Sequence, residues 1–262
     1  MDWDEWSRWY ERIRGALNYS LVDDSSAATL LSTMIKDRAL DLAVLRALIE
    51  GRDVLVFGAG PSLLHTMSRI CSDPSASIYS MRGSVVLMAA DGACRALIEH
   101  GIRPDAVVTD LDGDHEYLLC SDTLGSIMVV HAHGDNINLL KFMVPRLRNI
   151  IGTTQVRPLH NVHNFGGFTD GDRAVFIAHA MRARSITLIG MDLGSEVGQY
   201  SKPHPVVNTG VKIVKMRFAQ MLLEYLAGAG SGIGLYNLSP SRIEGFKNIE
   251  YEDLVQHIKD RA

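Results

Sequence analysis

The segment "SVVLMAADGACRALIEHGIRPDAVVTDLDGD", residues 84–114, decides the fold. It contains two short runs of apolar and β-branched residues, at 85–90 and 106–109, with an amphipathic stretch between them. Continuous apolar runs of this length are typical of parallel strands that helices cover on both faces. The segment therefore predicts a strand, a crossover helix and a second parallel strand.

The same pattern recurs along the chain after Gly51. Further runs are "DVLVFG" (53–58), "SIMVVHAHGD" (126–135), "NIIGTT" (149–154) and "SITLIGMD" (185–192), and "GLYNLSP" (234–240) fits an edge strand. Helical patterns fill 209–227 and the region near 250–260. The predicted fold is α/β, with an open, mainly parallel sheet flanked by helices.

Residues 1–50 have helical periodicity instead. Five apolar residues at spacings of three and four share one helix face: Trp3, Trp6, Tyr10, Ile13 and Leu17. A cap at 23–25 predicts a second, long helix that continues to about Ile49. We expect an N-terminal helical segment (1–50) followed by an α/β catalytic domain (51–262). The aromatic helix either mediates a homodimer or packs on its own sheet.

Composition narrows the class of protein. The formal net charge of -4 argues against broad electrostatic binding to nucleic acid. The three cysteines are scattered without metal-ligand spacing, which is typical of reduced thiols in a cytoplasmic protein. The acidic, aromatic N-terminus does not resemble a signal peptide, and no apolar run reaches the ~20 residues that span a bilayer. We expect a cytoplasmic protein that binds small molecules and neither membranes nor nucleic acid.

Polar residues and glycines gather where the predicted strands end. They are Gly58, Gly60, Asp91, Asp110, Asp112, His133, Asp135 and Asp192. The carboxyl ends of parallel strands meet at one edge of a sheet, which is where open α/β folds bind ligands. This coincidence predicts a single crevice lined by carboxylates.

The motif "TDLDGD" (109–114) has three interpretations. Two carboxylates after a buried strand suit a Mg²⁺ ion shared with substrate phosphates. The same pattern occurs in phosphatases whose first aspartate, here Asp110, attacks phosphorus, although Asp114 stands where that motif usually has threonine. In the third interpretation one aspartate only caps the helix beginning near His115, which leaves the other unexplained.

Two other motifs flank the crevice. "FGAGPSL" (57–63) is a strand, glycine turn and helix start that can hold a phosphate, with Gly58, Gly60, Pro61 and Ser62 as contacts. Leu63 stands where a dinucleotide site needs glycine, so NAD is not expected. "VVHAHGDN" (129–136) resembles the zinc motif of the metallo-β-lactamase fold, but that fold is antiparallel. Here His131 is expected in the core, with His133 and Asp135 in the crevice and Lys141 within reach of a phosphate.

Two loops complete the predicted site. The glycine-rich stretch 160–175 offers aromatic and polar groups to a flat ring, namely Asn164, Phe165, Gly166, Phe168 and Asp170. The polar stretch 198–205 carries Lys202, which can fold over phosphates.

The residues resemble a known family. "ADGACRALIEHGIRPDAVVTDLDGD" (90–114) and "HGDNINLLK" (133–141) are similar to the motifs of thiamin pyrophosphokinases. With "FGAGPSL", "NFGGFTDGDRA" and "LIGMDLG", the sequence more closely resembles the archaeal-type 6-hydroxymethyl-7,8-dihydropterin pyrophosphokinases, over roughly 20–260. That family shares the thiamin pyrophosphokinase catalytic-domain fold, and the domain recurs in proteins linked to flagellin glycosylation.

The resemblance implies a specific chemistry. It implies Mg²⁺ bound by Asp110, Asp112 and Asp135, and ATP as co-substrate near the Gly58–Ser62 turn, Asp91, Lys141 and Lys202. A pterin alcohol is the implied acceptor, with Asp192 in its site and His133 or a carboxylate as the base. Thr109 and the single glycine of "DGA" depart from the thiamin enzymes and weaken that assignment. The alternatives are a thiamin-type enzyme acting on another alcohol, a glycosylation-linked relative that binds a nucleotide sugar, and a phosphatase.

Overall fold

The computed structural model describes residues 1–72, 83–194, 196–201, 209–230 and 232–261. These residues form one nine-stranded sheet in the order β6-β5-β4-β3-β2-β1-β7-β8-β9, and neighbouring strands are parallel throughout. The strands are β1 (Asp53–Phe57), β2 (Val85–Ala90), β3 (Ala106–Thr109), β4 (Ile127–Ala132), β5 (Ile150–Thr154), β6 (Val162–His163), β7 (Ser185–Ile189), β8 (Gly234–Asn237) and β9 (Lys247–Asn248). The predicted α/β fold is confirmed. The sequence did not indicate β6 and β9, because two-residue strands are too short to produce a pattern.

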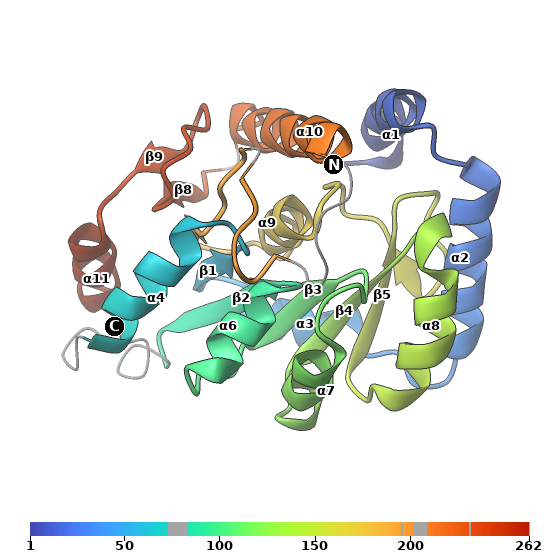
Figure 1. The fold of residues 1–262 in the computed structure, drawn as a ribbon, viewed down its shortest axis with the longest axis horizontal. Coiled ribbons are helices and arrows are strands. Elements are labelled where there is room, and N and C mark those ends of the chain that lie inside the picture. The colour runs from blue at the N-terminus through green and yellow to red at the C-terminus, as the bar shows by residue number, and fades with distance from the viewer. Residues whose placement is uncertain (73–82, 195, 202–208, 231, 262) are drawn as a thin grey trace.

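Helices cover both faces of the sheet, and each face has its own apolar core. On β1, Leu55 and Phe57 enter one core while Val54 and Val56 enter the other, because successive side chains point to opposite faces. The first core receives α2 (Leu21–Met34), α4 (Ser62–Ser72), α6 (Ala93–Glu99), α7 (His115–Thr123), α8 (Ile137–Met143) and α11 (Tyr251–Lys259). The second receives α1 (Trp3–Leu17), α3 (Leu42–Ile49), α9 (Asp170–Ala180) and α10 (Thr209–Gly228). Figure 1 shows α6 and α7 in front of the strands.

The strand order places the ligand crevice. Strands β1 to β6 follow one another toward one edge, and the chain then returns to place β7 on the other side of β1. Helix α9 makes this return across β3, β2 and β1. The order therefore reverses between β1 and β7, which is where open α/β sheets bind their ligands.

The N-terminal helices pack against the sheet of their own chain. Trp6, Tyr10 and Ile13 are buried, and the indole nitrogen of Trp6 donates to the backbone oxygen of Gln155 at 2.7 Å. The predicted long helix up to Ile49 is wrong. Helix α2 begins after a Ser20 cap and ends at Met34. Residues 35–38 then form a turn, and Ala39 pairs with Ile150 of β5 before α3 begins.

A backbone hydrogen bond explains that break. The amide of Leu40 donates to the carbonyl oxygen of Ile150 at 2.8 Å, and Ala39 forms a parallel bridge to the same residue. A tertiary pairing thus replaces helical hydrogen bonds that the local sequence would otherwise favour.

Within the described ranges, no helix is both long enough and apolar enough to span a membrane.

Candidate active site

A cavity of about 500 Å³ lies at the carboxyl ends of the central strands. Its walls include the glycine turn after β1, the residues after β2 and β3, the end of β4, and Gly190 to Leu193 after β7. The start of α9 and one side of α10 close the opposite wall. The crevice predicted from polar residues at strand ends is therefore present as one cavity.

Three carboxylates converge in this cavity. Oxygen atoms of Asp91, Asp110 and Asp170 all lie within 4.8 Å of one another. Asp112 also lines the cavity. Asp91 and Asp110 follow the neighbouring strands β2 and β3. Asp170 comes from the first turn of α9, much later in the sequence.

The backbone around the acids is unusual. Asp91 and Leu111 both have positive φ, 36° and 71°, although neither is glycine. Leu111 is fully buried, and its amide donates to the hydroxyl of Thr109 at 2.8 Å. That hydroxyl donates to a carboxylate oxygen of Asp91 at 2.6 Å. Conformations of this kind cost free energy and cluster at functional sites, where the surrounding packing maintains them.

The capping interpretation of "TDLDGD" now has a definite answer. Asp114 caps α7, its side chain accepting from the amide of Glu116, and it leaves both Asp110 and Asp112 in the cavity wall. The absence of a side chain at Gly113 leaves room for the carboxylate of Asp91. A Cβ atom at this position would lie 2.6 and 2.7 Å from the two carboxylate oxygens of Asp91.

Asp170 lies in an unfavourable environment for a negative charge. Burial, together with the negative charges of Asp110 and Asp91, raises its pKa well above the usual value, and the nearby Arg173 opposes that effect. Arg173 is buried and donates to the backbone oxygens of Gly167 and Phe168. A cation bound among the acids would relieve the repulsion that raises the pKa of Asp170.

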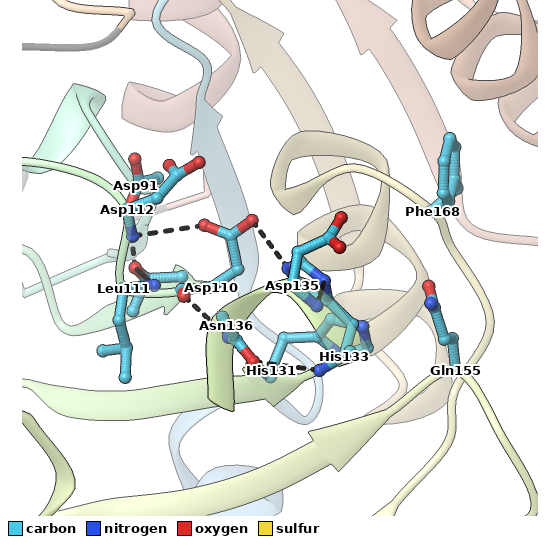
Figure 2. A network of polar contacts seen from close by, with 12 residues as sticks. Asp91, Asp110, Leu111, Asp112, His131, His133, Asp135, Asn136, Gln155 and Phe168 are labelled. Carbon is cyan, nitrogen blue, oxygen red and sulfur yellow. Dashed lines mark hydrogen bonds and ion pairs between the residues drawn. The ribbon is translucent and has the colours of Figure 1, made fainter. Parts of the chain in front are cut away.

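The end of β4 supports the acid cluster through His133. Its Nε2 atom lies 3.2 Å from a carboxylate oxygen of Asp110. The side-chain amide of Asn136 donates to the backbone oxygens of Asp110 and His131, both at 2.7 Å, and so joins the ends of β3 and β4 (Figure 2). Asp135 is exposed and is not among the cavity-lining residues. The structure thus brings Asp91 and Asp170, rather than Asp135, to Asp110.

The glycine turn after β1 is hydrogen-bonded to the residues that follow β7. The amide of Gly60 donates to the carbonyl oxygen of Gly190 at 2.8 Å. The amide and hydroxyl of Ser62 both donate to one carboxylate oxygen of Asp192, at 2.8 and 2.7 Å. Gly58 and Gly60 line the cavity with Asp192, but Pro61 and Ser62 do not. An aspartate therefore occupies the helix N-terminus that was predicted to hold a phosphate.

Of the remaining residues predicted for the site, some line the cavity and others do not. Phe168 lines the cavity. Asn164 instead stabilises its own loop, donating to the backbone oxygen of Val156 and accepting from the amide of Gly166. Phe165 pairs with the ring of His163, and Lys141 is exposed on α8; neither lines the cavity. Lys202 lies outside the described residues.

Several cavity residues were not predicted from the sequence. Tyr19, His131, Gln155, Thr169, Arg173, Lys212 and Lys215 all line the cavity. The two lysines are three residues apart on α10, a spacing that puts them on one helix face and was the one available signal. Burial lowers the pKa of Lys212, whose ammonium donates to the backbone oxygen of Glu196. Lys215 lies 5.9 Å from the centre of the Tyr19 ring.

The family model described as "6-hydroxymethylpterin diphosphokinase MptE-like" matches residues 31–198. The chain belongs to this MptE-like family. The resemblance noted from the sequence is thereby confirmed, and the matched range includes Asp91, Asp110 and Asp170.

Named relatives agree with the family. The MptE-like chain is 38% identical over 236 residues to a 6-hydroxymethyl-7,8-dihydropterin pyrophosphokinase of Methanocaldococcus jannaschii, covering 86% of this chain and 96% of the relative. Proteins of the same name in Methanothermobacter thermautotrophicus and Pyrococcus furiosus are 39% and 42% identical, over 88% of this chain and 97% and 96% of theirs.

A solved structure shares the fold of the MptE-like chain. It is the MAf glycosyltransferase from Magnetospirillum magneticum AMB-1, with a TM-score of 0.59 and 14% identity, over 94% of this chain and 42% of that one. At this identity the likeness concerns the fold alone.

Proposed function

We propose that this MptE-like protein transfers a pyrophosphate group from ATP to the hydroxymethyl group of 6-hydroxymethyl-7,8-dihydropterin and releases AMP. The proposal is supported by the names of its relatives and carried by one observation: three carboxylates meet in a cavity large enough for a drug-sized ligand. We propose that the protein acts in the cytoplasm. A homodimer stays a prediction.

The donor set suits a magnesium ion. Asp91, Asp110 and Asp170 offer hard carboxylate oxygens from three different elements, with Asp112 next to them. The mutual repulsion that raises the pKa of Asp170 is what a divalent cation would offset. Bound there, Mg²⁺ would stabilise negative charge on the triphosphate oxygens. Asp135 as a further ligand stays a prediction.

The cavity has separate groups for the phosphates and for a flat ring. Lys212 and Lys215 provide positive charge on the α10 side, where a triphosphate needs it. Phe168 lies in the wall with Tyr19, the two ring centres 6.2 Å apart. These rings give a planar heterocycle an apolar surface. Figure 2 shows Phe168 at the opposite side of the view from Asp91 and Asp112.

The reaction requires positioning and one proton acceptor. The hydroxyl oxygen of the pterin alcohol attacks the β-phosphorus, the bond from that phosphorus to the α-phosphate oxygen breaks, and AMP leaves. The hydroxyl proton has to pass to a base. A carboxylate of the cluster is suited to accept it. The Nε2 atom of His133 contacts Asp110 and its Nδ1 atom accepts from the backbone amide of Asp135, so His133 as the base stays a prediction.

The test is to incubate the protein with ATP, Mg²⁺ and 6-hydroxymethyl-7,8-dihydropterin, with thiamin as a parallel acceptor, and to separate AMP from ADP by chromatography. AMP formed in the presence of the dihydropterin alone would support the proposal. If folded protein forms no AMP with either acceptor, the proposal is wrong and a nucleotide-sugar function gains support. A phosphatase would instead release inorganic phosphate and form an aspartyl-phosphate on Asp110.

A further inference from the structure

A buried hydrogen-bond network connects the N-terminal helices to the cavity. Asp24 of α2, Gln155 after β5 and His131 of β4 are exposed by only 3%, 3% and 2%. The hydroxyl of Tyr10 and the side-chain amide nitrogen of Gln155 both donate to the same carboxylate oxygen of Asp24, at 2.5 and 2.7 Å. The other oxygen of Asp24 accepts from the amide of Gly134 at 2.7 Å. Asp24 is thus held on both sides.

This network determines which way the amide of Gln155 faces. A carboxylate only accepts hydrogen bonds, so the NH₂ group of Gln155 has to point to Asp24. The carbonyl oxygen of the amide is then on the other side, toward the cavity that Gln155 lines and toward His131, with which its side chain interacts. The backbone of Gln155 is also fixed, because its carbonyl oxygen accepts from the indole of Trp6.

The ring of His131 lies between Thr153 and Gln155. The hydroxyl of Thr153 lies 3.2 Å both from the backbone oxygen of Val130 and from the Nδ1 atom of His131, so it can donate to either. The Nε2 atom of His131 is buried without a hydrogen-bond partner of ordinary geometry among the described residues.

The carbonyl oxygen of Gln155, which faces the cavity, and the buried Nε2 atom of His131 thus lie in the lining of the same cavity. A buried polar group without a partner is costly, so these two atoms suit a ligand whose edge supplies the complementary hydrogen bonds. Phe168 and Tyr19 line the same cavity and can cover the face of a flat ring.

We propose that Gln155 and His131 recognise the hydrogen-bonding edge of the planar acceptor substrate, that the Gln155 carbonyl oxygen accepts from an amino donor on that edge, and that Asp24 is the positioning residue that orients Gln155. This inference rests on the proposed function. In a pterin the amino donor is the 2-amino group, next to a ring N–H. Asp170, which the sequence offered as a polar group for the flat ring, belongs to the acid cluster instead.

A 2-oxo analogue of the dihydropterin, the lumazine form, tests the inference, because it replaces the amino donor with an acceptor. We expect the wild-type protein to bind the dihydropterin at least tenfold more tightly than the 2-oxo analogue, measured by ligand fluorescence without ATP. The Gln155→Leu variant should lose most of that ratio. The Asp24→Asn variant should reduce it as well, since an asparagine side chain allows the Gln155 amide to turn over.

The matched control is Ser32→Ala, also on α2. Its hydroxyl donates to the side chain of Asn161 at 2.6 Å, and neither residue lines the cavity, so the ratio should not change. Thermal unfolding of each variant identifies loss of folding. If Gln155→Leu does not fold, the inference is tested by two measurements: the affinity ratio of the wild type for the two ligands, and the same ratio in Asp24→Asn.

The outcomes separate this inference from the proposed function. Equal binding of the two ligands by the wild type, or an unchanged ratio in a folded Gln155→Leu or Asp24→Asn variant, overturns the inference even if AMP is formed. Discrimination that depends on Gln155 and Asp24 without AMP formation supports the inference and contradicts the proposed pyrophosphoryl transfer.

Discussion

Replacing Gly113 with alanine should inactivate the protein without removing any functional group. The added Cβ would lie 2.6 Å from one carboxylate oxygen of Asp91, whereas ordinary contacts begin at 3.4 Å. The carboxylate must therefore move by about 3.4 - 2.6 = 0.8 Å. Gly113 does not have positive φ, so alanine adds no backbone strain. The expected effect is confined to the position of one carboxylate.

The magnitude follows from how strongly catalysis depends on position. A displacement of ~1 Å can reduce a rate about 100-fold, so we expect kcat for AMP formation to fall roughly 10- to 100-fold. The atom that has to give way is the end of a side chain, so the midpoint temperature should change by only a few degrees.

The control for Gly113→Ala is Gly15→Ala, on α1, where a Cβ atom would meet nothing within 4 Å. This variant should retain full activity and be slightly more stable, since alanine favours helices over glycine. The reasoning would be refuted if folded Gly113→Ala retained wild-type kcat while Asp91→Asn was inactive. A large loss of stability in Gly113→Ala would also contradict it.

Three further predictions concern charges around the cavity. Asp170 has a raised pKa in the folded protein, so the folded state holds a proton that the unfolded chain has lost, and metal-free stability falls as pH rises above ~4. Asp170→Asn should remove that fall in stability and raise the midpoint temperature of the metal-free protein at neutral pH. The same variant should form no AMP and should not be stabilised by Mg²⁺. An unchanged pH profile of thermal unfolding would contradict this prediction. Lys212→Met with Lys215→Met should raise the Kd for ATP at least tenfold and leave dihydropterin binding unchanged, as isothermal titration with each ligand would show. Asp192→Ala removes the acceptor for both Ser62 donors and should lower the free energy of unfolding by about 1 kcal/mol in urea titrations, and a stability equal to wild type would refute the capping role.

The crevice itself could be predicted from the sequence, but its third carboxylate could not. Asp110 follows β3, and the ends of β2 and β4 lie next to it because adjacent parallel strands are ~4.8 Å apart. Any ordering that keeps these strands adjacent brings Asp91 and His133 to Asp110. Asp135 is only two residues after His133, yet a short turn carries it to the surface.

By itself, the sequence determined most elements of this protein, because the apolar runs and helical periods are local properties of the chain. It did not indicate β6, β9 or the break between α2 and α3. It also determined that acids and glycines stand at strand ends. Only the tertiary structure decided that α9 crosses back over the sheet and delivers Asp170 to the acid cluster. In the same way, only packing brings Asp24 of α2 to Gln155, 131 residues later. Such pairings depend on strand order and helix crossing, which no local pattern encodes.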